Sequence, residues 1–142
     1  MGESLIRRAR PSDAPALSRL IAQLGYEADE SDVSERLAAM EAEGRAVLAA
    51  ELDARVIGCL TTSVMRVLHR PAPVGRISMM VVDEAHRGRG IGSQLVRAAE
   101  AALAEQGCYM VEVTSHVRRT QAHRFYETLG YAKTSVRLAR EL

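Results

Sequence analysis

The chain has 142 residues, of which 47% are hydrophobic and 26% are charged, and its formal net charge is +1. This length predicts a single domain, residues 1–142, with a substantial core. The balanced charge excludes a general attraction to nucleic acid or to anionic membranes. No apolar run approaches membrane-spanning length, and the first residues lack the apolar core of a signal peptide.

The two cysteines, Cys59 and Cys108, lie in apolar contexts and do not have the spacing of a metal-binding pair. We expect free thiols, which are typical of a reducing compartment. The cysteines therefore favour a cytoplasmic protein without a metal site.

The first half of the chain alternates strand and helix patterns. Asp13 is predicted to cap the first helix, and Asp32 with Glu35 resembles a capping box for the second. In chain order, we expect a strand over 5–9, a helix over 13–25, a helix over 32–44 and strands over 46–51 and 56–68.

The second half begins with an apolar run, continues through a glycine loop and enters a long amphipathic helix. We expect a strand over 77–82, a helix over 91–107, a strand over 109–114, a helix over 119–129 and a final strand over 131–139. The strand-helix-strand unit in the middle should be a parallel crossover. The order β-α-α-β-β-β-α-β-α-β predicts an α/β (α+β) fold, with a mixed, mostly antiparallel sheet and helices on both faces.

The glycine loop has three alternating glycines, Gly88, Gly90 and Gly92, with Arg87 and Arg89 between and before them. The first turn of a helix carries unpaired N–H groups and the positive end of the helix dipole. A loop of small residues lets a phosphate approach those groups closely. The loop is therefore a candidate diphosphate site, and a plain glycine-rich turn between a core strand and a core helix is the alternative.

The spacing separates this loop from two other phosphate-binding motifs. No lysine follows the glycines, as a P-loop requires, and Ser93 occupies the third glycine position of a dinucleotide fingerprint. The pattern Arg-x-x-Gly-x-Gly does fit, and it resembles the acyl-CoA signature of the GCN5-related N-acetyltransferases, the GNAT family.

A second motif supports the same resemblance. Residues 122–131, Ala-His-Arg-Phe-Tyr-Glu-Thr-Leu-Gly-Tyr, are similar to the late GNAT motif Ala-x-x-Phe-Tyr-x-x-x-Gly-Phe/Tyr. The stretch over 112–126 is also similar to aminoalkylphosphonate N-acetyltransferases. The resemblance implies an acetyl-CoA cosubstrate lying where the fourth and fifth strands splay apart. It implies a binding role for the backbone of Met80, Val81, Val82, Arg87, Gly88, Arg89, Gly90, Ile91, Gly92 and Ser93.

Tyr126 matches the family tyrosine that protonates the departing thiolate. The alternative is a core aromatic on an amphipathic helix beside Phe125. Related enzymes often carry an acidic residue in the fourth strand, but this chain has Ser78 and Met79 there. The general base therefore stays open, with His116 as one candidate.

One further family position departs from the pattern. Arg119 stands where the family often has asparagine, and its role also stays open.

The leading hypothesis is transfer of an acetyl group by direct attack to the primary amine of a small molecule. A protein N-terminal or lysine acetyltransferase is the alternative among enzymes, and a CoA-binding sensor or interaction module without catalysis is the alternative of another class. The sequence does not identify the acceptor, and it leaves the oligomeric state open, a homodimer included.

Overall fold

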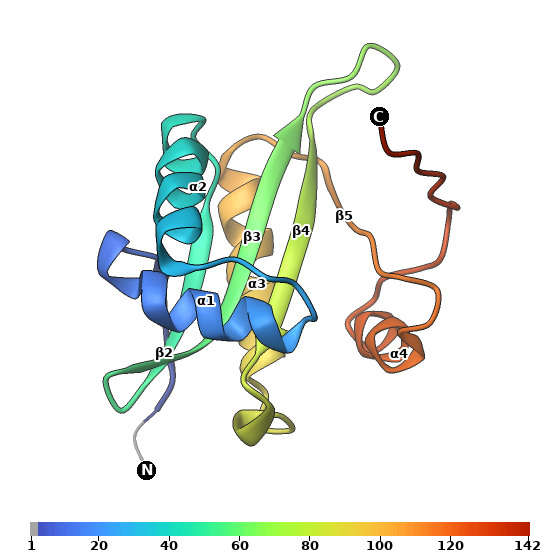
Figure 1. Cartoon of the computed structure of the whole chain (residues 1–142). Coiled ribbons are helices and arrows are strands. Elements are labelled where there is room, and N and C mark those ends of the chain that lie inside the picture. Colours follow the sequence, from blue (N-terminus) through green and yellow to red (C-terminus); the bar gives the residue numbers. More distant parts are fainter. Residues whose placement is uncertain (1–2) are drawn as a thin grey trace.

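The computed structural model describes residues 3–142, which form a five-stranded sheet with helices on both faces (Figure 1). The strands lie side by side in chain order, antiparallel from β1 to β4 and parallel between β4 and β5. They are β1 Leu5–Arg8, β2 Val47–Leu52, β3 Arg55–Met65, β4 Val74–Val82 and β5 Met110–Val113. The helices are α1 Ala14–Gln23, α2 Glu30–Ala42, α3 Ile91–Glu105 and α4 Thr120–Thr128, with 3-10 turns η1 Pro11–Asp13 and η2 Glu84–His86. The predicted fold class is confirmed.

Strand β2 shows why the sheet needs helices on both faces. Leu48 and Ala50 belong to the core shared with α3 and α4, whereas Val47 and Ala49 belong to the core shared with α1 and α2. Successive side chains of a strand point to opposite faces, so a continuous apolar run has to be covered twice. Both cores therefore follow from the apolar runs in the strands and the apolar stripes on the helices.

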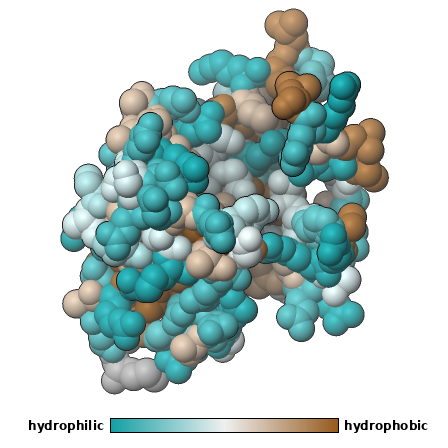
Figure 2. Space-filling model, viewed as in Figure 1, coloured by the Kyte–Doolittle hydropathy of each residue, from teal (hydrophilic) through white to brown (hydrophobic). Residues whose placement is uncertain are grey.

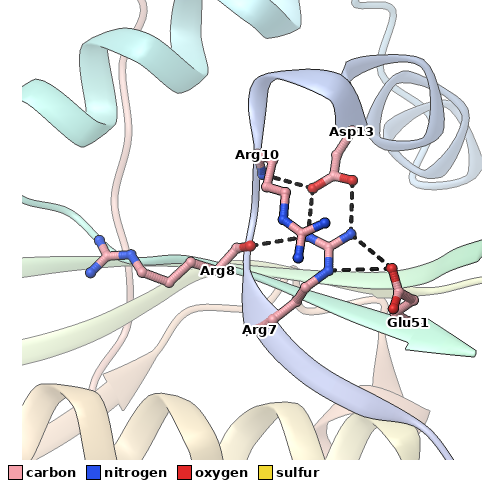
Figure 3. Close-up of polar contacts among 5 residues, drawn as sticks. All are labelled: Arg7, Arg8, Arg10, Asp13 and Glu51. Atoms are coloured by element: carbon pink, nitrogen blue, oxygen red, sulfur yellow. Dashed lines mark hydrogen bonds and ion pairs between the residues drawn. The ribbon is translucent and has the colours of Figure 1, made fainter. Parts of the chain in front are cut away.

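Asp13 lies just before α1, but its carboxylate does not cap that helix. It accepts hydrogen bonds from Arg7 Nη1 at 2.8 Å, Arg7 Nη2 at 3.0 Å and the Arg10 backbone N–H at 2.7 Å (Figure 3). Arg7 Nη2 also lies 3.2 Å from Glu51 Oε1. Asp13 is the N-cap residue of α1 as predicted, but its side chain makes no capping bond, because a guanidinium binds a carboxylate more strongly than a neutral N–H does. The cluster Arg7–Asp13–Glu51 instead ties β1 to β2 and to the turn before α1.

The second helix begins one turn earlier than predicted. Asp29 and Asp32 form the capping box: the Asp32 N–H donates to Asp29 Oδ1 at 2.8 Å, and the Asp29 N–H donates to Asp32 Oδ2 at 3.2 Å. The predicted box of Asp32 with Glu35 is therefore wrong. Asp29, Asp32 and Glu35 follow one another at intervals of three residues, so the sequence pattern of a capping box fits both the first pair and the second.

The predicted final strand over 131–139 is absent. Tyr131 still packs on the body, where its backbone N–H donates to the Tyr126 carbonyl at 3.0 Å and its hydroxyl to Glu100 Oε2 at 2.7 Å. Beyond it, residues 132–142 have no regular secondary structure and are exposed. The period-two pattern fits a strand, but a strand needs a neighbour for its backbone groups, and this segment has none within residues 3–142.

Candidate active site

Strands β4 and β5 pair over only part of their length. Their register runs from Val74↔Met110 to Ile77↔Val113, where β5 ends. From there β4 continues to Val82, and β3 is its only strand neighbour within residues 3–142. The expected opening between these strands is therefore present, and the free edge of β4 carries unpaired backbone groups.

A β-bulge lies at the point where the two strands separate. Thr61 pairs with Met79 and Thr62 pairs with Ile77, so Ser78 is an extra residue in β4. A bulge bends its strand and increases the local twist. This bend gives a physical reason for β4 to diverge from β5 at Ser78.

Beyond the bulge, the side chains of Met80, Val81 and Val82 pack in the two hydrophobic cores. Met80 and Val82 pack against the core of α3 and α4, and Val81 is buried in the core of α1 and α2. Backbone groups of a strand alternate between its two edges, so Met80 and Val82 direct their N–H and carbonyl groups to the free edge, whereas Val81, opposite Cys59, directs its own towards β3. A ligand lying along the edge would therefore meet N–H and carbonyl groups.

The glycine loop connects η2 to α3 and leaves the start of that helix open. Gly88 and Gly90 have φ angles of +77° and +81°, and a Cβ on either one would have no atom within 4 Å. Gly90 is the N-cap of α3, and no side chain caps the helix. Ile91 and Ser93 thus lie in a first turn whose N–H groups are open to an anion.

Gly92 differs from the other two glycines. It has an ordinary φ, but a Cβ there would lie 3.3 Å from Phe125 Cζ and 3.6 Å from Met80 Cε. The side chain of Phe125 therefore packs directly against the backbone of α3. The loop is therefore open at Gly88 and Gly90 but closed at Gly92, where a larger residue would push α3 and α4 apart.

The two loop arginines are both exposed. Arg87 Nε donates to the Val82 carbonyl at 3.0 Å, which holds the loop against the end of β4. Arg89 comes directly before Gly90, the N-cap residue of α3, and so lies next to the open first turn of that helix. The predicted cofactor-binding residues therefore lie on two segments that follow each other closely, the end of β4 and the loop into the first turn of α3, with Val81 and Ile91 buried among them.

Tyr126 is buried on α4, with 7% of its surface exposed. Its ring makes edge-to-face contacts with Phe125 and Tyr131, at centroid distances of 5.1 Å and 5.6 Å. Burial raises the pKa of the Tyr126 hydroxyl to about 12. Within residues 3–142 that hydroxyl has no hydrogen-bond partner. It is thus a protonated donor that the fold itself does not use.

His116 lies in the exposed loop between β5 and α4. Its Nδ1 accepts from the Arg118 N–H at 3.2 Å, and its carbonyl lies 3.0 Å from His123 Nε2. The imidazole of His123 therefore fastens this loop to α4. Arg119 Nη2, at the start of α4, donates to the Leu24 carbonyl at 3.3 Å.

A carboxylate close to the opening was not singled out from the sequence. Glu112 precedes the last paired residue of β5, and its Oε1 accepts from Arg76 Nη2 at 2.7 Å and Nε at 3.0 Å. At the bulge itself, the Ser78 and Thr61 hydroxyls lie 2.8 Å apart. The polar side chains at the point where β4 and β5 separate are therefore two hydroxyls and a carboxylate that an arginine already holds.

Gln23, also missed from the sequence, joins the end of α1 to the loop after β4. Its Nε2 donates to Asp83 Oδ1 at 2.8 Å, and its Oε1 accepts from the Glu84 N–H at 2.9 Å. Asp83 Oδ2 lies 2.6 Å from His86 Nδ1. The hydrogen bond from Gln23, followed by that with His86, holds the pKa of Asp83 below its usual range. A lone glutamine at a helix end carries no sequence signal for such a contact.

Residues 3–142 contain no group of three or more histidine, cysteine, aspartate or glutamate side chains able to hold a metal ion. Over the same residues, no helix is both long enough and apolar enough to cross a bilayer.

Comparison with known proteins places these features in a family. The acetyltransferase (GNAT) family model matches residues 14–131. An aminoglycoside N(6')-acetyltransferase of Stenotrophomonas maltophilia is 31% identical over 91% of this chain and 86% of its own length. An aminoalkylphosphonate N-acetyltransferase of Salmonella typhimurium is 32% identical over 63% of this chain, and the match spans 58% of that relative.

A solved structure shares the fold. An aminoglycoside N-acetyltransferase, AAC(6')-Iy, in complex with CoA superposes with a TM-score of 0.86 at 21% identity, over 98% of this chain and 95% of that one. The family model covers both the glycine loop and the helix that carries Tyr126. The chain therefore belongs to the GNAT family of acetyltransferases.

Proposed function

We propose that the chain is an acetyl-CoA-dependent N-acetyltransferase that transfers the acetyl group by direct attack to a primary amine of a small molecule. The names of the two relatives, which act on aminoalkylphosphonates and aminoglycosides, support a small-molecule acceptor. The observation that carries the proposal is the free edge of β4 leading into the uncapped first turn of α3. A ligand with an amide-bearing arm and a diphosphate satisfies both groups of unpaired backbone atoms.

The residues present fit this cosubstrate. We propose that the backbone of Met80, Val81 and Val82 pairs with the pantetheine arm, in the manner of an added strand. The space around Gly88 and Gly90 is open, so a diphosphate has room to reach the helix turn. The backbone groups proposed to hold it belong to Arg87, Gly88, Arg89, Gly90, Ile91, Gly92 and Ser93.

Acetyl-CoA, when bound, supplies an acetyl thioester that a neutral amine can attack. Tyr126 then donates its proton to the departing thiolate sulfur, and its pKa of about 12 keeps the hydroxyl protonated at neutral pH. Backbone N–H groups on the free edge of β4 donate to the oxygen on which negative charge develops.

The attacking amine also has to lose a proton. Ser78 and Met79 offer no base at the bulge, and the carboxylate of Glu112 is held by Arg76. We propose that the amine loses its proton to solvent, so that kcat/KM for an alkylamine climbs with pH towards the amine's own pKa of about 10. A plateau near neutral pH that disappears in His116→Ala would instead make His116 the base.

The net charge of +1 supports partners that are neither nucleic acid nor membrane. The free thiols of Cys59 and Cys108 support a reducing, cytoplasmic setting.

The function is tested by thiol release from acetyl-CoA over a panel of an aminoalkylphosphonate, an aminoglycoside and peptides with a free N-terminus or lysine. We expect turnover on one of the small amines. Turnover on peptides alone would make the chain a protein acetyltransferase. CoA binding without turnover on any acceptor would make it a binding module, and no CoA binding by calorimetry would overturn the cosubstrate.

A further inference from the structure

Part of the sheet face that carries α1 and α2 has no helix over it. α1 packs over β3 and β4, and α2 packs over β2. Figure 1 looks onto this face, and no helix lies in front of the upper halves of β3 and β4. In the same view, Figure 2 shows the surface there set back, with mostly pale residues that are neither strongly hydrophobic nor strongly hydrophilic. This uncovered area adjoins the point where β4 separates from β5.

Polar side chains occupy the uncovered area. Ile77 and Val113 pack in the core of α3 and α4. Arg76 and Glu112 directly precede them in β4 and β5, so their side chains lie on the opposite face of the sheet. The other polar side chains on this face carry hydroxyl groups and belong to Thr61, Ser63 and Ser78.

Arg76 and Glu112 form a cross-strand ion pair that uses only part of each charged group. Nε and Nη2 of Arg76 both donate to one oxygen, Glu112 Oε1, at 3.0 Å and 2.7 Å. Within residues 3–142, Arg76 Nη1 and Glu112 Oε2 have no hydrogen-bond partner. The two side chains are 37% and 33% exposed, so a ligand on the uncovered face can reach both unused groups.

The two unused groups define what kind of ligand fits them. Arg76 Nη1 can only donate hydrogen bonds, and the ionised carboxylate of Glu112 can only accept them. A hydroxyl group does both, so it can bind the two groups at once. A phosphonate or carboxylate would be repelled by Glu112, and a second ammonium group would be repelled by Arg76.

We propose that Arg76 and Glu112 select acceptors that carry a hydroxyl group near the reacting amine, as amino sugars and amino alcohols do. The selection rests on the proposed function, because the amine has to reach the opening beside Ser78. Glu112 directly precedes Val113, where the pairing of β4 with β5 ends, so a bound hydroxyl holds the acceptor next to that opening. An acceptor without the hydroxyl forgoes both hydrogen bonds and is selected against by their loss.

The test compares turnover of acetyl-CoA on glucosamine, an amino sugar, with turnover on cyclohexylamine, a ring amine without hydroxyl groups. The double variant Arg76→Met, Glu112→Leu removes both polar groups and keeps an apolar cross-strand contact between β4 and β5. We expect kcat/KM for glucosamine to fall about 10- to 100-fold, and that for cyclohexylamine to change less than about 3-fold. Each amine is compared with itself, so the different pKa values of the two amines do not affect the result.

Two single variants accompany the double variant. Glu112→Gln keeps the shape of the side chain and should shift the preference in the same direction, by a smaller factor. Glu43→Gln is the control, because Glu43 forms an exposed ion pair with Arg45 after α2, and it should change neither kcat/KM.

Three kinetic results would overturn the selection while leaving an acetyltransferase. An equal fall for both amines would show that the ion pair only holds β4 to β5. An unchanged kcat/KM for glucosamine would show that the pair does not contact the acceptor. Turnover on 2-aminoethylphosphonate but not on glucosamine would show that the site selects an anionic acceptor.

Binding provides a second measurement that does not need turnover. With the protein saturated with CoA, glucosamine should shift the amide NMR signals of residues 61–63, 76–78 and 110–113, and it should not do so in the double variant. Absence of these shifts in the natural chain would overturn the selection. Their presence without turnover on any amine would count against the proposed function and not against the acceptor contact.

Discussion

At the scale of single residues, Tyr126 carries the proposed chemistry through a hydroxyl that the fold does not bind. Tyr131, five residues along, has its hydroxyl bound to Glu100, and burial followed by that bond raises its pKa above the usual value. The two tyrosines are neighbours in one aromatic cluster, so they form a matched pair for experiment.

Tyr126→Phe should lower the turnover rate constant about 100-fold, as expected for loss of a general acid. The affinity for CoA should change little, because the ring and its packing stay. Tyr131→Phe is the control: it should cost about 1 kcal/mol of unfolding free energy through its lost bond and leave turnover unchanged. Steady-state kinetics with calorimetry measure both, and normal turnover in Tyr126→Phe would make that residue a core aromatic only.

Asp13 makes the stability of the fold depend on pH. Its carboxylate is 8% exposed, and the bond from Arg7 lowers its pKa in the folded protein. A lowered folded pKa stabilises the fold above the unfolded pKa of about 3.9, and this stabilisation is lost as pH falls through the folded value.

Asp13→Asn should therefore lower the free energy of unfolding by about 2 kcal/mol at pH 7, because it removes a charge-assisted bond. The difference from the natural chain should shrink as pH falls below about 4 and both side chains become neutral. Urea unfolding from pH 2 to pH 7 measures this. Asp53→Asn, in an exposed turn, should show no such pH-dependent loss; a pH-independent deficit at Asp13 would exclude the ion pair as its cause.

At the scale of elements, the glycine loop and the end of α1 shape the proposed cofactor site together. Gly90→Asn is the sharpest probe of the loop, because asparagine tolerates the left-handed backbone and its side chain would enter open space. We expect the affinity for CoA, measured by calorimetry, to fall at least about 10-fold. The asparagine side chain would fill the space proposed for the diphosphate and keep it from the N–H groups of the first helix turn.

Gly44→Asn provides the control for backbone strain. Gly44 has a similar φ of +75° and equally open surroundings after α2, away from the loop. This variant should keep the natural CoA affinity and a comparable thermal stability. Equal affinities in the two variants would move the diphosphate to another loop.

Gln23 links α1 to the loop before α3 by two hydrogen bonds, so it should position that loop for the cosubstrate. Gln23→Ala should raise the KM for acetyl-CoA about 3- to 10-fold and leave kcat nearly unchanged, in line with two exposed hydrogen bonds. Gln106→Ala, at the end of α3, removes a comparable exposed glutamine and should change neither constant. A fall in kcat alone would show that Gln23 does not act through the loop.

At the scale of the whole molecule, the two halves of the sheet differ in burial. β2 and the middle of β3 are largely buried, whereas β5 is half-buried throughout and α4 has one buried residue. Local opening is easiest where few buried contacts oppose it. The side of the site formed by β5 and α4 should therefore be the more mobile one.

Hydrogen exchange should reveal this difference. Amides of β2 and β3 should exchange slowest, and those of β5 and α4 faster. Adding CoA should slow exchange at 78–82, where one edge of β4 has no strand neighbour, and at 91–93, in the uncapped first turn of α3, and leave α2 unchanged as the internal control. Protection confined to other segments would contradict the proposed binding surface.

The sequence by itself determined the order of the elements as far as α4 and the location of the glycine loop. The periodicity of a helix, the apolar run of a strand and the glycine that ends a helix depend on residues within a few positions of one another. They can therefore be recognised in the sequence without knowledge of the tertiary structure. The two family motifs are equally local. The predicted lengths were close, with α3 running from Ile91 to Glu105 where 91–107 was expected.

Tertiary structure decided the features that depend on distant partners. Asp13 turned to Arg7 instead of capping α1, the bulge at Ser78 opened β4 from β5, and Gln23 reached a loop 60 residues away. The strand pattern after Tyr131 has no neighbouring strand in the described part of the chain. In each case the local pattern allowed more than one outcome, and the choice depended on which charged group or backbone edge folding brought within hydrogen-bonding distance.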